Sequence, residues 1–216
     1  MKILLIGGTG NIGQRILKEA LDKGHEVTAV QRKPEALELK HPNLTTVKGD
    51  VLNEIELPSL FAGIDVVVSA TSLYAGLTAE QFKQAHQNLI DVLKKQPQTR
   101  IIAVGGATNN ENSVDIKMLD DAEFMKHIPE EIKPSIFAHN EVQGLYENSG
   151  LENWTYFNPA AMLQAGERTG KFRLGTTALV VDENGASNIS FEDYAVALVD
   201  EIKNQQFVGK PFTIGY

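Results

Sequence analysis

Cysteine is missing from this chain of 216 residues, which excludes disulfide bonds, a thiolate nucleophile, iron–sulfur clusters and cysteine-based zinc sites. The five histidines are scattered and show no paired spacing, so no metal site is expected. No apolar run approaches the ~20 residues that a membrane-spanning helix needs. The sequence therefore predicts neither a metal centre nor a membrane protein.

Basic residues are also scarce, with 20 Lys and Arg against 28 Asp and Glu and a net charge of −8. This balance argues against a partner that is nucleic acid or a membrane surface. Met1 leads directly into an apolar segment and leaves no room for a signal peptide, so we expect a cytoplasmic protein. The length suits one α/β domain spanning 1–216. The exposed face of the helix expected over 78–96 is polar and indicates no oligomeric state.

The most informative stretch is at the beginning of the chain. Four apolar residues (3–6) precede glycines at every third position, and a helical apolar pattern follows them. A strand, a glycine turn and a helix in this order are typical of a dinucleotide-binding fold, in which the helix N-terminus faces the phosphates. We therefore expect cofactor contacts from Gly7, Thr9, Gly10, Asn11, Ile12 and Gly13.

A second strand is expected over 25–30, and the residues after it bear on the choice of cofactor. NAD-binding versions of this fold carry an acidic residue here, which holds the ribose 2′-hydroxyl. This chain has Gln31, Arg32 and Lys33 instead. A guanidinium beside an ammonium suits a 2′-phosphate, so the sequence favours NADP(H) over NAD(H). In the alternative interpretation, Arg32 and Lys33 are solvated charges in a surface loop.

Further strands are expected over 44–51, 64–71, 100–106 and 154–159, with helices over 78–96 and 135–149. Together they predict an α/β, Rossmann-type doubly wound parallel sheet of order 3-2-1-4-5-6. The cofactor should lie along the carboxyl ends of these strands, near Asp50, Val51, Ser69, Ala70, Thr71, Gly105, Gly106 and Pro159. Asp50 has two possible roles: it contacts the adenine end of the nucleotide, or it caps the next short helix.

Two regions depart from this repeat. Residues 109–134 lose their periodicity and gain charge, as expected for a substrate lid or, alternatively, a surface excursion. Residues 159–216 are expected to form a smaller, substrate-side region. Its elements should be short strands over 171–174, 179–181 and 212–214 and a helix capped by Ser190.

Several motifs indicate a family. The glycine turn, Gly49-Asp50-Val51, Val104-Gly105-Gly106-Ala107 and Asn158-Pro159-Ala160-Ala161 resemble those of the NmrA-like atypical short-chain dehydrogenases. Residues 166–175 and 189–195 are similar to the NADH-flavin reductase family. The resemblance spans nearly the whole chain. It implies an NAD(P)-binding Rossmann domain that transfers hydride to a flavin or quinone-like acceptor, the flavin being a substrate rather than a tightly bound cofactor.

The chain departs from the wider dehydrogenase superfamily at its Tyr-x-x-x-Lys pair. Alignment on residues 149–151 puts Ser135 and His139 at those two positions, and the sequence contains no Tyr-x-x-x-Lys. Ketone reduction therefore lacks its usual acid, whereas hydride transfer to a flavin needs none. His139 is a candidate proton donor or water-positioner, or else an ordinary surface histidine. A catalytically silent NAD(P) redox sensor is the alternative function.

The acceptor is expected beneath residues 109–134 and the loop from Pro159 to Thr169. Candidate substrate contacts are Thr108, Met162 and Arg168. Arg168 could meet an anionic group such as a flavin phosphate, and an ion pair within a structural loop is the alternative.

Overall fold

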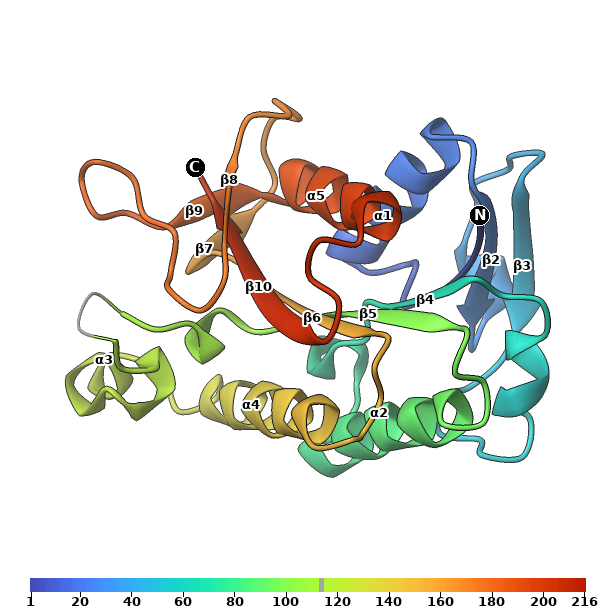
Figure 1. Ribbon diagram of the computed structural model, residues 1–216, viewed down its shortest axis with the longest axis horizontal. Helices are drawn as coiled ribbons and strands as arrows, with labels where there is room; N and C mark the ends of the chain where they lie inside the picture. The colour runs from blue at the N-terminus through green and yellow to red at the C-terminus, as the bar shows by residue number, and fades with distance from the viewer. Residues whose placement is uncertain (113–114) are drawn as a thin grey trace.

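The computed structural model describes residues 1–112 and 115–216, and it shows a sheet between two layers of helices (Figure 1). The main sheet has the order β3-β2-β1-β4-β5-β6-β10-β8. Its first six strands run parallel, which confirms the expected order 3-2-1-4-5-6. Their bounds are β1 (Lys2–Ile6), β2 (Glu26–Gln31), β3 (Leu44–Lys48), β4 (Val66–Ser69), β5 (Arg100–Val104) and β6 (Trp154–Asn158).

Helices cover both faces of this sheet. Helices α1 (Asn11–Asp22) and α5 (Phe191–Asn204) lie on one face, and α2 (Ala79–Leu93) and α4 (Lys133–Glu147) lie on the other (Figure 1). Each pair closes its own apolar core against the strands between them. The central strands are consequently buried on both faces, which explains their continuous apolar sequences. Among the helices that the structure describes, none is long and apolar enough to cross a membrane.

The structure divides residues 159–216 differently from the expected small region. Strand β10 (Lys210–Gly215) pairs in parallel with β6 and extends the main sheet, while α5 packs against α1. Strand β8 (Arg173–Gly175) continues this sheet antiparallel to β10, whereas β7 (Met162–Gln164) and β9 (Asn188–Ser190) pair with each other in a separate two-stranded sheet. Residues 179–181 form no strand. Beside them, Ala178 makes an isolated β-bridge with Glu111, in which Leu179 N–H donates to the Glu111 carbonyl at 2.9 Å.

The segment 109–134 is built from short helical turns. After η4 (Ala107–Asn109) come η5 (Met118–Asp120) and α3 (Ala122–Lys126), and residues 113 and 114 lie outside the described part of the chain. Asn110 is buried, and its Nδ2 donates to the Pro159 carbonyl at 3.0 Å and to Thr213 Oγ1 at 3.1 Å. These bonds tie the start of the segment to the sheet. The other short turns are η1 (Pro34–Ala36), η2 (Leu57–Phe61) and η3 (Leu73–Ala75).

Candidate cofactor site

A cavity of about 720 Å³ lies at the carboxyl edge of the parallel strands, beside the N-terminus of α1. Open α/β sheets bind their ligands at this edge. The volume is within the usual ~300–1,000 Å³ of small-molecule sites. The cavity is lined by Ile6, Gly7, Thr9, Gly10, Asn11, Ile12, Gly13, Val30, Gln31, Arg32, Gly49, Asp50, Val51, Ala70, Thr71, Ser72, Tyr74, Leu77, Val104, Gly105, His139, Leu163 and Phe191.

The connection between β1 and α1 requires glycine at two positions, Gly7 and Gly13. Gly7 has φ +84°, and a Cβ there would lie 2.3 Å from the Ala70 carbonyl oxygen. A Cβ on Gly13 would lie 2.0 Å from the Gly7 carbonyl oxygen. The close packing of Gly7 on Ala70 and of Gly13 on Gly7 holds the first turn of α1 near the carboxyl end of β4, so the N-terminus of this helix faces the cavity.

Gly10 is different, because its missing side chain leaves space on the cavity side. It is the N-cap of α1, has φ −73°, and a Cβ there would meet only the Gly7 carbonyl oxygen at 3.4 Å. Its N-cap position supplies no side-chain acceptor to the helix. The first N–H groups of a helix have no intrahelical partner, and together with the helix dipole they attract an anion. This geometry suits a pyrophosphate.

The ends of β2 and β3 form one end of the cavity. Gln31 is the last residue of β2, and its buried Nε2 has no hydrogen-bond partner among the residues that the structure describes. Arg32 follows it, is exposed and also lines the cavity. Across from them, Asp50 lines the cavity while its Oδ1 accepts from Leu52 N–H at 2.9 Å. This bond closes a turn and caps no helix, since the next helix, η2, has Glu56 as its N-cap, so the capping interpretation is wrong. Contact of Asp50 with the adenine end of a nucleotide stays a prediction.

His139, from α4, lies at the other end of the cavity, with Val104, Gly105 and two apolar side chains, Leu163 and Phe191. A Cβ on Gly106 would lie 2.9 Å from the His139 Cβ, so this glycine lets α4 approach β5 closely. The hydroxyl of Tyr156 donates to the His139 carbonyl at 3.0 Å and lies 3.2 Å from its Nδ1.

The protonation state of His139 follows from this arrangement. The Tyr156 hydroxyl donates its proton to the His139 carbonyl, so its oxygen accepts a hydrogen bond from Nδ1–H of the His139 ring. Nε2 of that ring then carries no proton and can act as a hydrogen-bond acceptor. Burial lowers the pKa of His139 to about 4. The imidazole is therefore neutral at pH 7 and offers a lone pair rather than an acidic proton.

A family model for NAD(P)H-binding proteins matches residues 7–205, a range that includes the whole glycine turn and both helical layers. The chain belongs to this NAD(P)H-binding family.

Known relatives of this NAD(P)H-binding chain cover its full length. The uncharacterised protein YwnB of Bacillus subtilis is 32% identical over 99% of this chain and 98% of its own. A solved structure from Bacteroides thetaiotaomicron, described as a candidate epimerase, is 36% identical, covers 100% of this chain and 96% of its own, and has a TM-score of 0.89. A solved structure from Streptococcus pneumoniae, described as a candidate NADH-flavin reductase, is 31% identical and has a TM-score of 0.83. The match covers 100% of this chain and 99% of the other.

In this NAD(P)H-binding protein, most residues expected from the sequence line one cavity. They are Gly7, Thr9, Gly10, Asn11, Ile12, Gly13, Arg32, Asp50, Val51, Ala70, Thr71, Gly105 and His139. Others are outside its lining, namely Lys33, Ser69, Gly106, Thr108, Pro159, Met162 and Arg168. Of the described residues between 109 and 134, none lines it either.

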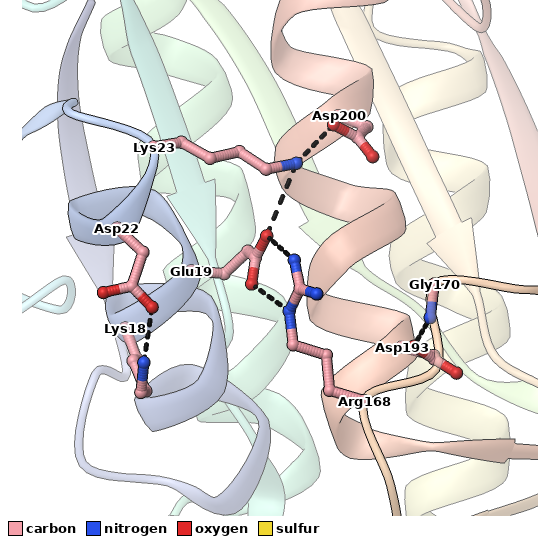
Figure 2. Close-up of polar contacts among 8 residues, drawn as sticks. All are labelled: Lys18, Glu19, Asp22, Lys23, Arg168, Gly170, Asp193 and Asp200. Atoms are coloured by element: carbon pink, nitrogen blue, oxygen red, sulfur yellow. Dashed lines mark hydrogen bonds and ion pairs between the residues drawn. The ribbon is translucent and has the colours of Figure 1, made fainter.

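Arg168 lies outside the cavity lining and forms an ion pair with α1. Its Nε and a terminal nitrogen each lie 2.8 Å from a carboxylate oxygen of Glu19, as Figure 2 shows. This two-point bond lowers the pKa of Glu19 despite the burial of that carboxyl. The Asp193 carboxylate of α5 accepts from Gly170 N–H at 2.8 Å and fixes the next part of the same loop (Figure 2). The geometry matches the alternative interpretation, an ion pair in a structural loop.

Several cavity residues were not predicted from the sequence. Leu163 lies on β7 and Phe191 is the first residue of α5, and both approach the cavity from the far end of the chain. Tyr74 lies on η3, directly after β4, with an exposed ring. An aromatic residue so close to the carboxyl end of a predicted strand is the one signal that could have indicated it. The remaining wall residues outside the predicted set are Ile6, Val30, Gln31, Gly49, Ser72, Leu77 and Val104.

Proposed function

We propose that this protein transfers hydride from NADPH to a flavin or quinone-like acceptor in the cytoplasm. The observation that carries the proposal is a single cavity that joins a phosphate-binding helix N-terminus to an apolar wall of Leu163 and Phe191. A nicotinamide dinucleotide and a planar acceptor need these two environments side by side. The similarity to a protein described as a candidate NADH-flavin reductase supports the same activity.

The residues at the glycine turn fit a dinucleotide. Gly10 opens the cavity to a pyrophosphate at the N-terminus of α1, while Gly7 and Gly13 keep the turn closed against β4. Bound NADPH supplies the hydride. The chain itself binds and orients the dinucleotide, and the apolar wall excludes water from the acceptor.

Two features support NADP(H) over NAD(H). The carboxylate that would hold a ribose 2′-hydroxyl is replaced by the neutral amide of Gln31, whose Nε2 is a hydrogen-bond donor. Arg32 adds a positive charge at the same end of the cavity. A 2′-phosphate would meet donors and a cation there rather than a negative charge.

His139 is proposed to position water or the acceptor. Its neutral ring and the free lone pair on Nε2 suit a hydrogen-bond acceptor at the edge of the cavity. The low pKa disfavours the alternative role of a proton donor at neutral pH. A reduced flavin can take its proton from water, so the proposal needs no acidic side chain.

The test combines calorimetric titration of NADPH and NADH with assays of their oxidation in the presence of FMN, FAD, riboflavin and a simple quinone. Turnover with one of these acceptors and tighter binding of NADPH are the expected results. Tight binding without any turnover would instead support the redox sensor, which Ser135 and His139 favour because they stand in place of the Tyr-x-x-x-Lys pair.

A further inference from the structure

A chain of hydrogen bonds runs from the wall of the cavity into the core. Thr71 lines the cavity, and its hydroxyl lies 3.0 Å from Nε2 of His86. On the other side of that ring, Nδ1 lies 2.8 Å from the Tyr146 hydroxyl. Ser69 adds a branch, with its hydroxyl 3.0 Å from that of Thr71. Neither His86 nor Tyr146 lines the cavity, and both are 0% exposed.

The rings in this chain are held in place by their neighbours. The Phe82 ring meets the His86 ring edge to face at 4.8 Å, and Tyr146 stacks on Trp154 at 6.0 Å. Burial, with a smaller contribution from nearby His139, lowers the pKa of His86 to about 3. At neutral pH this imidazole carries one proton, so one of its nitrogens donates and the other accepts.

The buried Tyr146 hydroxyl decides which nitrogen donates. Within the described part of the chain, His86 is its hydrogen-bond partner. If Nδ1 carried the proton, the Tyr146 proton would be buried without an acceptor, which is unfavourable. Tyr146 therefore donates to Nδ1, and Nε2–H donates to the Thr71 oxygen. The proton of Thr71 is then available for a bond away from His86.

The position of Thr71 identifies what that proton can reach. Its backbone nitrogen would lie 3.2 Å from a Cβ on Gly7, so it adjoins the glycine turn at which the pyrophosphate and its riboses would lie. With Ser69 able to donate to the second lone pair of Thr71, the Thr71 O–H can turn fully to the cavity.

We propose that Tyr146 and His86 are positioning residues that hold the Thr71 hydroxyl as a hydrogen-bond donor to a sugar or phosphate oxygen of the dinucleotide. This rests on the proposed function, because the ligand is the same dinucleotide. Thr71 contacts the ligand, and the other two act through it. The consequence is that a tyrosine outside the cavity influences nucleotide affinity.

The first measurement needs no variant. Nitrogen-15 NMR of the unchanged protein distinguishes the two neutral tautomers of His86, and we expect the proton on Nε2. A proton on Nδ1 would overturn the proposal. Tyr146→Phe removes the hydroxyl that donates to Nδ1, so the fraction of His86 protonated on Nδ1 should rise. No change in that fraction would remove Tyr146 from the proposal.

Calorimetry with NADPH gives the second measurement. Thr71→Val should weaken binding by roughly tenfold, the size of one hydrogen bond to a ligand oxygen, and Thr71→Ser should restore it. Tyr146→Phe should weaken NADPH binding by about threefold. In a protein that already carries Thr71→Val, adding Tyr146→Phe should weaken binding no further, because Tyr146 acts through Thr71. Thr99→Val is the matched control, since it removes another buried threonine hydroxyl, one that donates to the Ile64 carbonyl at 3.1 Å.

The outcomes separate this proposal from the proposed function. If the unchanged protein binds no nucleotide, both are wrong. If it binds NADPH but Thr71→Val binds equally well, only the donor role of Thr71 is wrong and the reductase proposal stands. Equal losses in Thr71→Val and Thr99→Val would show a general effect of destabilisation and would also overturn the donor role.

Discussion

The two ends of α1 are held in opposite ways. At its N-terminus, the cap is a glycine without a side-chain acceptor, and the backbone N–H groups face the cavity. At its C-terminal half, Glu19 and Lys23 are ion-paired with Arg168 and with Asp200 of α5 (Figure 2). One end keeps its polar groups available for a ligand, while the other end uses its side chains to fix the helix. Binding and anchoring are therefore separate tasks on a single helix.

This division explains the role of Arg168, for which the sequence leaves open both contact with an anionic acceptor and an ion pair in a structural loop. The stretch that contains Arg168 follows β7 and is held by the first turn of α5, where Glu192 accepts from Gly166 N–H at 2.9 Å. Glu192 also pairs with Arg15 of α1 at 3.0 Å. This stretch contributes to the site indirectly, because it determines where α1 lies.

The largest effect is expected from Gly10→Val at the binding end. The branched side chain would occupy the space for the pyrophosphate without straining the backbone, because φ is −73° and the nearest atom is 3.4 Å from the added Cβ. NADPH affinity should fall by at least ~100-fold, about 2.8 kcal/mol, with the melting temperature nearly unchanged. Calorimetry and thermal unfolding measure the two quantities.

Two further glycines serve as controls for this change. Gly144→Val places the same side chain in open space on α4 and should leave NADPH affinity intact. Gly13→Val should prevent folding instead, since its Cβ would overlap the Gly7 carbonyl. Unchanged NADPH binding in Gly10→Val would show that the pyrophosphate lies elsewhere.

Arg32→Ala tests the charge at the edge of the same cavity. Loss of a charge-assisted contact should weaken NADPH binding by ~1–3 kcal/mol and leave NADH almost unaffected. Lys33→Ala is the matched control, because Lys33 is also exposed but lies outside the cavity lining. Equal losses for the two nucleotides in Arg32→Ala would contradict the 2′-phosphate role.

At the anchoring end, Arg168→Gln should lower the free energy of unfolding by about 1 kcal/mol, since Glu19 is buried but Arg168 is half exposed. Lys18→Gln breaks the exposed pair with Asp22 shown in Figure 2 and should cost almost nothing. Urea unfolding measures both. A role for Arg168 in acceptor binding would appear as a raised KM for FMN without any loss of stability.

The smallest effect is the pH dependence of this anchor. The pKa of Glu19 is lowered chiefly by the hydrogen bond from Arg168, so the stabilisation is fully present above the ordinary carboxyl pKa of 4.5. It is lost as the pH falls below 4.5 and passes through the lowered pKa. The difference in unfolding free energy between the unchanged protein and Arg168→Gln should therefore shrink as the pH is lowered from above 4.5 through the lowered pKa of Glu19. A constant difference would contradict the ion-pair mechanism.

The sequence predicted the glycine turn and the parallel sheet because their signals are local. Strand, glycines and helix follow one another within the first 22 residues, and the strands carry continuous apolar runs. The helix expected over 78–96 is likewise confirmed as α2, which begins at a capping box of Thr78 and Gln81.

The partners of distant residues could not be predicted in this way. Arg168 meets a carboxylate 149 positions earlier, and nothing in its own neighbourhood distinguishes that role from anion binding. Leu163 and Phe191 reach the cavity from β7 and from the start of α5, and a three-residue strand such as β7 has no measurable period. The buried pairing of His86 with Tyr146 joins residues 60 positions apart on two helices.

The anchoring of α1 also governs when the site can form during folding. The helix belongs to the first βα unit, yet Arg168, Glu192 and Asp200 contact it from 149 to 177 positions further along the chain. Contacts between residues so far apart in the sequence form late in folding, because the long chain segment between them must be ordered first. We therefore expect nucleotide added during refolding to bind only after the slowest phase, when α5 has docked.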